Sequence, residues 1–226
     1  MISRLPTWVW IGAGTLALVA GMVNVVGLIG FEHQGLSHLS GTTSQLGEAL
    51  AQGSGRAALQ LLLVLAAFVA GALLSGLLIG GAALQLGRPY GAALSIEAGL
   101  LALAVPLFEH HHMGGALVAA MACGLQNALT TTYSGALIRT THVTGMFTDL
   151  GMFLGNRLRG LPVDGRRIAL CLLVATGFLC GGVLGALLFP HLGYRTLWLP
   201  ALLTGSAGVA YVVYDLRRRT TTNTKR

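Results

Sequence analysis

Long apolar stretches alternate with short polar breaks along the whole chain. An α-helix needs about 20 consecutive, mostly apolar residues to cross the hydrocarbon core of a bilayer. Six stretches meet or approach this length, namely Trp8–Phe31, Ala57–Leu84, Tyr90–Phe108, Met113–Ile138, Arg167–Phe189 and Tyr194–Leu216. The pattern predicts an all-α membrane protein with about six transmembrane helices, the first of which is a membrane helix rather than a cleaved signal peptide.

Two further segments, His38–Gly53 and His142–Leu158, are shorter, rich in glycine and amphipathic. We expect each to be a re-entrant half-helix; a short buried span and a surface helix are the alternatives. If both segments re-enter and the basic tail is cytoplasmic, Arg56 and Arg195 are the arginines left outside. If both segments crossed the membrane fully, three arginines would lie outside. Re-entry leaves one fewer positive charge outside, so the positive-inside rule favours it by one charge.

The chain contains an internal repeat. Both short segments read His-x-Ser/Thr-Gly-x-x-x-x-Leu-Gly, starting at His38 and at His142. Further matches flank this motif in the same order: Gly21–Asn24 with Gly124–Asn127, Phe68–Gly71 with Phe178–Gly181, and Tyr90 with Tyr194. Four ordered matches predict a duplication, with a first repeat at 1–108, a second at 109–216 and a basic cytoplasmic tail at 217–226.

The number of spans in each repeat decides how the repeats are related. Three spans would turn the second repeat upside down, an inverted arrangement that many transporters use. Four spans would make the repeats parallel. Within the repeats, Gly71 with Ser75 and Gly181 with Gly185 form small-x-x-x-small pairs. Such pairs let two helices approach closely, so we expect helix packing contacts there.

Composition narrows the function classes. The sequence is 54% hydrophobic and 9% charged, whereas a soluble domain carries about 25% charged residues. The formal net charge of +7 comes from bases between the apolar stretches and in the tail. This placement is typical of topology signals, and no nucleic-acid recognition motif accompanies it. We expect an integral membrane protein with cytoplasmic N- and C-termini that contacts lipid and no nucleic acid.

The repeated motif favours a polar site inside the membrane. Ser40 and Thr144 are suited to cap a helix N-terminus, and Gly41 and Gly145 allow the backbone to bend. A helix that begins within the membrane directs its positive end inward. Two such ends that face one midplane site would favour an anion or the negative end of a dipole. The alternative is that these residues only cap and pack helices.

Histidine and asparagine give the motif regions their chemistry. A histidine in a membrane segment is costly unless it is paired, and it often marks a proton or substrate route; His38 and His142 are such residues. Asn24 and Asn127 lie deep in apolar stretches, where an amide must be hydrogen-bonded. The four side chains are predicted to line a central polar site. Hydrogen bonds that only hold the repeats together are the alternative.

Two carboxylates lack an acidic partner in the other repeat. Glu97 lies in the middle of a predicted span, and Asp149 follows the second motif. Unpaired carboxylates in a membrane are functional candidates, so Glu97, His142 and Asp149 are candidates for proton coupling. The alternative for Glu97 is a buried acid that stays neutral or binds an arginine. No catalytic motif is present, and we expect no enzyme activity, no cofactor and no metal.

The repeated motif, with Gly-x-x-Asn before it, resembles the YoaK-like family of bacterial membrane proteins, a family of unknown function. Thr141–Gly145 with Asp149–Gly151 carries the more specific part of the resemblance, which covers nearly the whole chain. It implies a bacterial inner-membrane protein with about six spans and supplies no substrate. The chain departs from the family pattern at Asn24, where Asp is common, and at Thr42, where Asn is common.

Together these features predict a transporter or channel for a small polar or anionic solute. Its site is expected between the repeats, near the bilayer midplane. The predicted site residues come from both repeats: Asn24, His38, Ser40, Gly41, Asn127, His142, Thr144 and Gly145. The alternatives are a non-transporting membrane scaffold or assembly protein and, third, a membrane-embedded enzyme. The expected partners are the solute, membrane lipid and a second copy of the chain in a homo-oligomer.

Overall fold

The computed structural model of the chain describes residues 6–31, 35–80, 88–133 and 140–223. All regular secondary structure within these ranges is helical. The elements are α1 (Thr7–Gly30), α2 (Leu39–Ala51), α3 (Gly55–Ile79), α4 (Arg88–Glu109), α5 (Gly114–Tyr133), α6 (Val143–Leu158), α7 (Gly165–Leu192), the 3-10 helix η2 (Gly193–Leu197) and α8 (Trp198–Asn223). The predicted all-α character is confirmed for this part of the chain.

Four of these stretches are long and apolar enough to cross a membrane. They are α1, α3, Pro89–Glu109 of α4, and Gly165–Val213, which contains α7, η2 and much of α8. These helices identify a membrane-embedded protein. α5 is not among them, because polar residues in its second half, such as Gln126, lower its mean hydropathy. The predicted span Met113–Ile138 corresponds to α5, and its residues 134–138 fall outside the described ranges.

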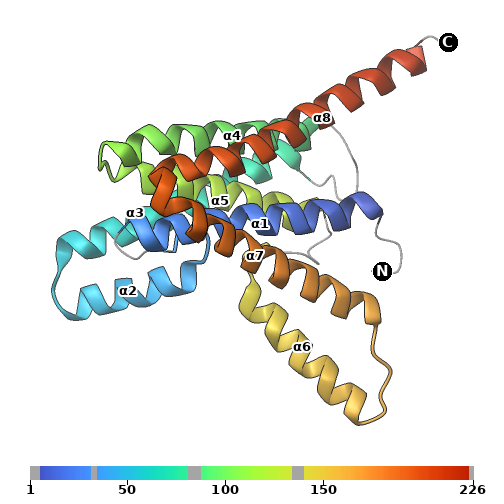
Figure 1. The fold of residues 1–226 in the computed structure, drawn as a ribbon, viewed down its shortest axis with the longest axis horizontal. Coiled ribbons are helices and arrows are strands. Elements are labelled where there is room, and N and C mark those ends of the chain that lie inside the picture. Colours follow the sequence, from blue (N-terminus) through green and yellow to red (C-terminus); the bar gives the residue numbers. More distant parts are fainter. Residues whose placement is uncertain (1–5, 32–34, 81–87, 134–139, 224–226) are drawn as a thin grey trace.

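The long helices lie side by side along the long axis of the molecule (Figure 1). α1 packs most extensively on α7, α3 on α5, and α4 on both α8 and α5. The start of α1 and the end of α8 lie toward the same end of the molecule, and we call this the terminal end of the bundle (Figure 1). The other end holds Gly30 of α1 and the turn at η2, and we call it the distal end.

Glycines bring helix backbones into direct contact in two of these pairs. The contacts, given as the distance from a Cβ atom built on the glycine to a carbonyl oxygen, are Gly21 to Phe178 (2.0 Å), Gly181 to Leu18 (1.9 Å), Gly124 to Phe68 (1.9 Å) and Gly71 to Met121 (1.9 Å). No Cβ fits at such distances, so glycine is required at all four positions. The α1–α7 and α3–α5 pairs use the same contacts at matching positions of the repeated sequence. The close packing expected at Gly71 and Gly181 is confirmed.

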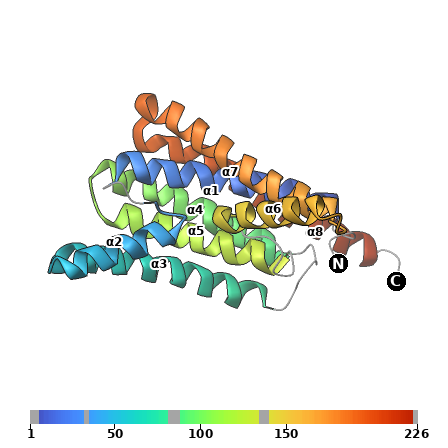
Figure 2. The same ribbon diagram turned by 90° about the horizontal axis from the view of Figure 1, so that it is seen from below.

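The short helices α2 and α6 begin near the centre of the molecule and run outward in opposite directions (Figure 1 and Figure 2). α2 runs to the distal end and packs on α3, whereas α6 runs to the terminal end and packs on α7. Each is followed by a glycine with positive φ, Gly53 at +69° and Gly160 at +71°. A left-handed glycine is a common helix ending, and it lets both chains turn sharply into the next long helix.

Within the described residues, the two larger clusters of buried apolar side chains lie one toward each end of the bundle, and a third, small cluster lies between α2 and α3. On α4, the terminal cluster includes Tyr90 and Leu94, and the distal cluster includes Leu101 and Phe108. Glu97 lies between them and is 1% exposed. On α5, the equally buried Gln126 lies at the same boundary, next to Leu125 of the terminal cluster and three residues after Cys123 of the distal cluster. The centre of the bundle therefore contains buried polar side chains between two apolar layers.

Candidate functional site

The N-termini of α2 and α6 meet near the centre of the molecule (Figure 2). The Nδ1 atom of His38, which precedes α2, lies 3.1 Å from the carbonyl oxygen of Thr141, which lies just before α6. Because a carbonyl oxygen can only accept, Nδ1 donates in this hydrogen bond, a protonation inferred from the partner. The bond joins residues 103 positions apart. It holds the two short helices with their positive ends facing each other.

The starts of these helices differ from the sequence prediction. His38 and His142 occupy the N-cap positions, and neither donates or accepts a side-chain cap hydrogen bond. The prediction that Ser40 and Thr144 cap the helices is wrong, because both residues already lie inside the first helical turn. The first N–H groups of a helix have no partner within the helix, and here no N-cap side chain takes them. These groups are suited to bind a ligand.

Hydrogen bonds hold the chain before α2 against α1. The Oδ1 atom of Asn24 accepts from the backbone N–H of Ser37 at 3.2 Å and from the Ser37 hydroxyl at 3.1 Å. The Thr42 hydroxyl donates to the Gly35 carbonyl oxygen at 3.2 Å. Ser37 and Thr42 are both buried. These bonds fix the position of His38 at the N-terminus of α2.

The chain before α6 is held by a glutamine of α5. The amide nitrogen of Gln126 donates to the Leu16 carbonyl oxygen of α1 at 2.5 Å and to the Thr140 hydroxyl at 3.3 Å. Gln126 and Thr140 are both buried. A single side chain thus connects α1, α5 and the segment that leads into α6, on the same side of the molecule as the His38–Thr141 bond.

An open groove of about 610 Å³ lies beside the meeting point of the two helices. Its walls come from α1, the residue before α2, the first turns of α6, and α7. They are Asn24, His38, Val143, Thr144, Phe147, Thr148 and Phe178. None of these residues is acidic, and the positive end of α6 forms one wall. A helix N-terminus favours negative charge, whereas Val143, Phe147 and Phe178 make much of the rest of the groove apolar.

A family model described as "Protein of unknown function (DUF1275)" matches residues 12–210. The chain belongs to the DUF1275 family. The match begins in α1 and ends in α8, so it includes the groove and both copies of the motif. No curated protein and no solved structure matches the chain.

The structure of this DUF1275 protein brings only part of the predicted site together. Three predicted residues line the groove: Asn24, His38 and Thr144. Ser40 and Gly41 are exposed in the first turn of α2, and a Cβ atom built on Gly41 would meet open space. A Cβ atom on Gly145 would lie 2.1 Å from Nε2 of His142. Gly145 thus lets the exposed His142 ring fold back over α6.

The other predicted residues lie apart from the groove. Asn127 is on α5, and its Oδ1 atom is buried without a hydrogen-bond partner. Glu97 lies inside the bundle on α4. Asp149 is exposed on α6. The proton-coupling candidates His142, Glu97 and Asp149 therefore do not line the groove.

Sequence reasoning missed four polar residues that build the meeting point: Ser37, Gln126, Thr140 and Thr141. Ser37 and Thr141 occupy the same position, directly before the motif histidine of each repeat. Extending the repeated motif by one residue upstream would have found both. Gln126 was inside a matched segment, and its position beside Asn127 in an apolar stretch was the available signal.

Replacing Asn24 with leucine should cost more stability than the same change at Asn127. Asn24→Leu leaves the buried Ser37 backbone N–H without its acceptor, whereas the Ser37 hydroxyl keeps the Ala20 carbonyl oxygen at 3.2 Å. A buried donor without a partner costs about 1–3 kcal/mol. Asn127→Leu removes an amide oxygen that has no partner, so we expect a neutral or stabilising effect. Thermal unfolding of the two purified variants measures the difference. An equal loss in both would contradict the role assigned to the Asn24–Ser37 hydrogen bonds.

Proposed function

We propose that this DUF1275 protein is a transporter or channel for a small polar or anionic solute, which binds in the groove near the bilayer midplane. The observation that carries the proposal is the His38–Thr141 hydrogen bond, which joins the N-terminal ends of α2 and α6 inside the protein. Helix N-termini carry partial positive charge. Within a membrane protein, two such ends favour an anion or the negative end of a polar solute.

The architecture that we propose is a pair of inverted repeats with six spans and two re-entrant half-helices. α1 and α2 both end at the distal end, and α5 and α6 both end at the terminal end (Figure 1). The chain therefore enters the membrane before α2 and leaves it after α2 at the same end, the distal end, and it does the same around α6 at the terminal end. Three spans remain in each repeat, which inverts the second relative to the first. The matching glycine contacts of the α1–α7 and α3–α5 pairs support the same relation.

Inversion explains how the groove would change during transport. Asn24 and His38 belong to the first repeat, whereas Thr144 and Phe178 belong to the second. The groove walls therefore move relative to one another when one repeat rocks against the other. Alternating access in inverted-repeat transporters uses such a motion around a fixed midplane site.

The sequence resemblance supports a YoaK-like protein of the bacterial inner membrane. The arginine distribution supports cytoplasmic N- and C-termini, because re-entry of α2 and α6 then leaves Arg56 and Arg195 as the arginines outside. The absence of a catalytic motif from the sequence supports solute binding rather than an enzyme reaction. A homo-oligomer stays a prediction.

Ion and solute flux in liposomes tests the proposed function. Liposomes that contain the purified protein are loaded with potassium chloride, nitrate, formate or acetate, and valinomycin is added to release potassium. We expect faster potassium efflux than in protein-free liposomes for at least one anion, because anion flux then balances the charge. Light scattering during glycerol or urea uptake covers neutral polar solutes in the same preparation.

The same assay separates the transporter from a membrane scaffold. If the protein is folded in the liposomes and none of these solutes moves faster than through lipid alone, the transport proposal fails. A scaffold whose motifs only hold the repeats together then becomes the better interpretation. Thermal unfolding in each anion, compared with gluconate, provides the binding measurement that accompanies the flux.

A further inference from the structure

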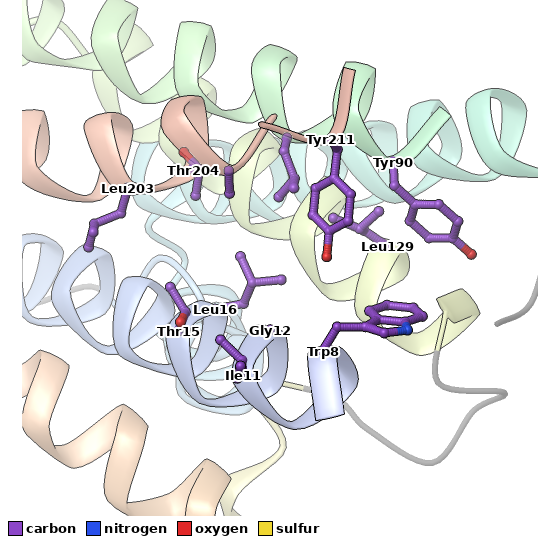
Figure 3. A pocket seen from close by; sticks show the side chains of 12 residues that line it. Trp8, Ile11, Gly12, Thr15, Leu16, Tyr90, Leu129, Leu203, Thr204 and Tyr211 are labelled. Carbon is purple, nitrogen blue, oxygen red and sulfur yellow. The ribbon is translucent and has the colours of Figure 1, made fainter. Parts of the chain in front are cut away.

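A second cavity lies between α1, α4, α5 and α8, toward the terminal end of the bundle (Figure 3). Its volume is about 180 Å³. Trp8, Tyr90 and Tyr211 gather at one end of this cavity, and Thr15 and Thr204 lie at the other (Figure 3). None of its lining residues lines the groove where the solute is proposed to bind, so the cavity is a separate feature of the bundle.

Glu97 lies just beyond the inner end of this cavity. Leu94, which lines the cavity, precedes Glu97 by one turn of α4. Gly205 of α8 packs directly against Ala98 of α4, because a Cβ atom built on Gly205 would lie 3.3 Å from the Cβ atom of Ala98. The residues that precede them, the cavity residue Thr204 and Glu97, therefore lie at the same height along the two packed helices. The Oε2 atom of Glu97 is buried without a hydrogen-bond partner. An ionised carboxylate is costly in such surroundings.

The helices around Glu97 offer no counter-ion at its depth. α1 and α5 contain no charged residue, α3 contains none after Arg56, and α8 contains none before Asp215. In η2, Arg195 lies 2.8 Å from Glu109 at the distal end. On α5, the buried Cys123 of the distal cluster is a free thiol and carries no positive charge. A proton is therefore the ligand that can neutralise this carboxylate.

The distal end of the same helix bundle is closed by aromatic side chains. Phe108 stacks on Tyr194 with ring centroids 4.6 Å apart. Phe31 contacts Phe108 at 5.6 Å, and Phe189 contacts Tyr194 at 5.5 Å. The Tyr194 hydroxyl also donates to the Gly30 carbonyl oxygen, which anchors this aromatic cluster to α1. The route from Glu97 to water therefore leads through the cavity to the terminal end.

We propose that Glu97 is a proton-binding site that is reached from the terminal end through the cavity and closed from the distal end by the aromatic cluster. Water at the cavity mouth supplies the proton, and the carboxylate takes it up as an O–H group. Thr15 and Thr204 line the inner part of the cavity, and the Thr204 hydroxyl donates to the backbone carbonyl oxygens of Pro200 and Ala201. This proton site rests on the proposed transport function, in which the proton is then the coupling ion. Because α4 and α8 belong to different repeats, the charge on Glu97 then affects how the repeats pack.

Reaction with dicyclohexylcarbodiimide tests the proposal without any solute. The protonated carboxyl adds its O–H across one C=N bond of the reagent, and the adduct rearranges to a stable N-acylurea with no leaving group. The purified protein is labelled over a pH series, and the peptide that contains Glu97 is analysed by mass spectrometry. We expect an adduct at Glu97 whose yield falls as the pH rises, because only the protonated form reacts. Glu97→Gln should remove it.

Two matched variants test the access route. Ala207→Leu adds bulk to the cavity wall, whereas Ala210→Leu adds the same bulk to an exposed position of the same helix. We expect a severalfold slower labelling of Glu97 in Ala207→Leu and an unchanged rate in Ala210→Leu, and thermal unfolding should show that both variants are folded. Equal rates in the two variants, or no adduct at any pH, would overturn the proposal.

Infrared spectroscopy provides a readout that needs no cavity variant. The C=O band of the neutral carboxyl is identified as the band present in the wild type and absent from Glu97→Gln. It should shift after transfer to D₂O, because the cavity lets the proton exchange. A band that does not shift identifies a sealed structural carboxyl. If labelling and exchange occur but no solute moves in liposomes, the proton site stands and only the transport function fails.

Discussion

Thr144→Asp is expected to reduce anion flux strongly while the fold stays intact. Thr144 is exposed in the first turn of α6 and lines the groove. A carboxylate at a helix N-terminus stabilises the helix by about 0.3–1 kcal/mol, so the variant should unfold at an equal or higher temperature. Two unit charges about 4 Å apart repel by about 4 kcal/mol at an effective dielectric constant of about 20. Water in the open groove screens part of this, and we expect at least about a tenfold loss of flux.

Thr144→Asn is the matched control for this prediction. It has nearly the same shape as aspartate, carries no charge and should keep most of the flux. Potassium efflux from liposomes with equal amounts of each variant measures the comparison. Similar flux in the two variants would show that the groove does not hold the anion. A loss of flux in both, with intact folding, would point to shape rather than charge at this position.

Gly181→Leu is expected to prevent the helices from packing. A Cβ atom at this position would lie 1.9 Å from the Leu18 carbonyl oxygen, so α1 and α7 must separate. Overpacking in a close-packed interior costs about 1–3 kcal/mol, occasionally more, and here the clash is with rigid backbone. We expect a loss near the upper end of that range or a failure to fold. Gel filtration and thermal unfolding in detergent measure it.

The neighbouring glycine of α7 provides the control. A Cβ atom at Gly182 meets no atom within 4 Å. Gly182→Ala should therefore be neutral or slightly stabilising, since alanine is a better helix former than glycine. Gly71→Leu should repeat the effect of Gly181→Leu, because Gly71 meets the Met121 carbonyl oxygen in the same way. Normal folding of Gly181→Leu would show that α1 and α7 are not in backbone contact.

The helices could be predicted from the sequence because their signals are local. Apolar length places α1, α4 and α7 within three residues of their bounds, and the motif places α2 and α6. The prediction is less accurate for α8, which begins four residues later and ends seven residues later than the predicted span 194–216, because the helix continues into the basic tail. The predicted end of the α3 span, Leu84, lies outside the described residues. The glycine contacts were also predictable, because Gly71 and Gly181 recur with a small residue four positions later. These features depend on residue size and polarity along one helix.

The candidate site could be predicted only in part, because its contacts join distant segments. Asn24 and Asn127 match in sequence, yet only Asn24 receives a hydrogen bond at its Oδ1 atom. Phe147 and Phe178 line the groove, and no pattern distinguishes them from lipid-facing phenylalanines. Glu97 was recognised as an unpaired acid, but its place between two apolar clusters follows from the packing of α4 against α5 and α8.

The sidedness of two loop positions tests the inverted, re-entrant arrangement most directly. Gln52 and Arg159 are exposed residues at the ends of α2 and α6. Each is replaced by cysteine after Cys123, Cys171 and Cys180 have been changed to alanine, and intact cells are treated with a membrane-impermeant maleimide. Gln52→Cys should be labelled, whereas Arg159→Cys should be labelled only after the membrane is permeabilised. Labelling of both from the same side would mean that α2 and α6 cross fully, and the two half-helices would not meet within the bilayer.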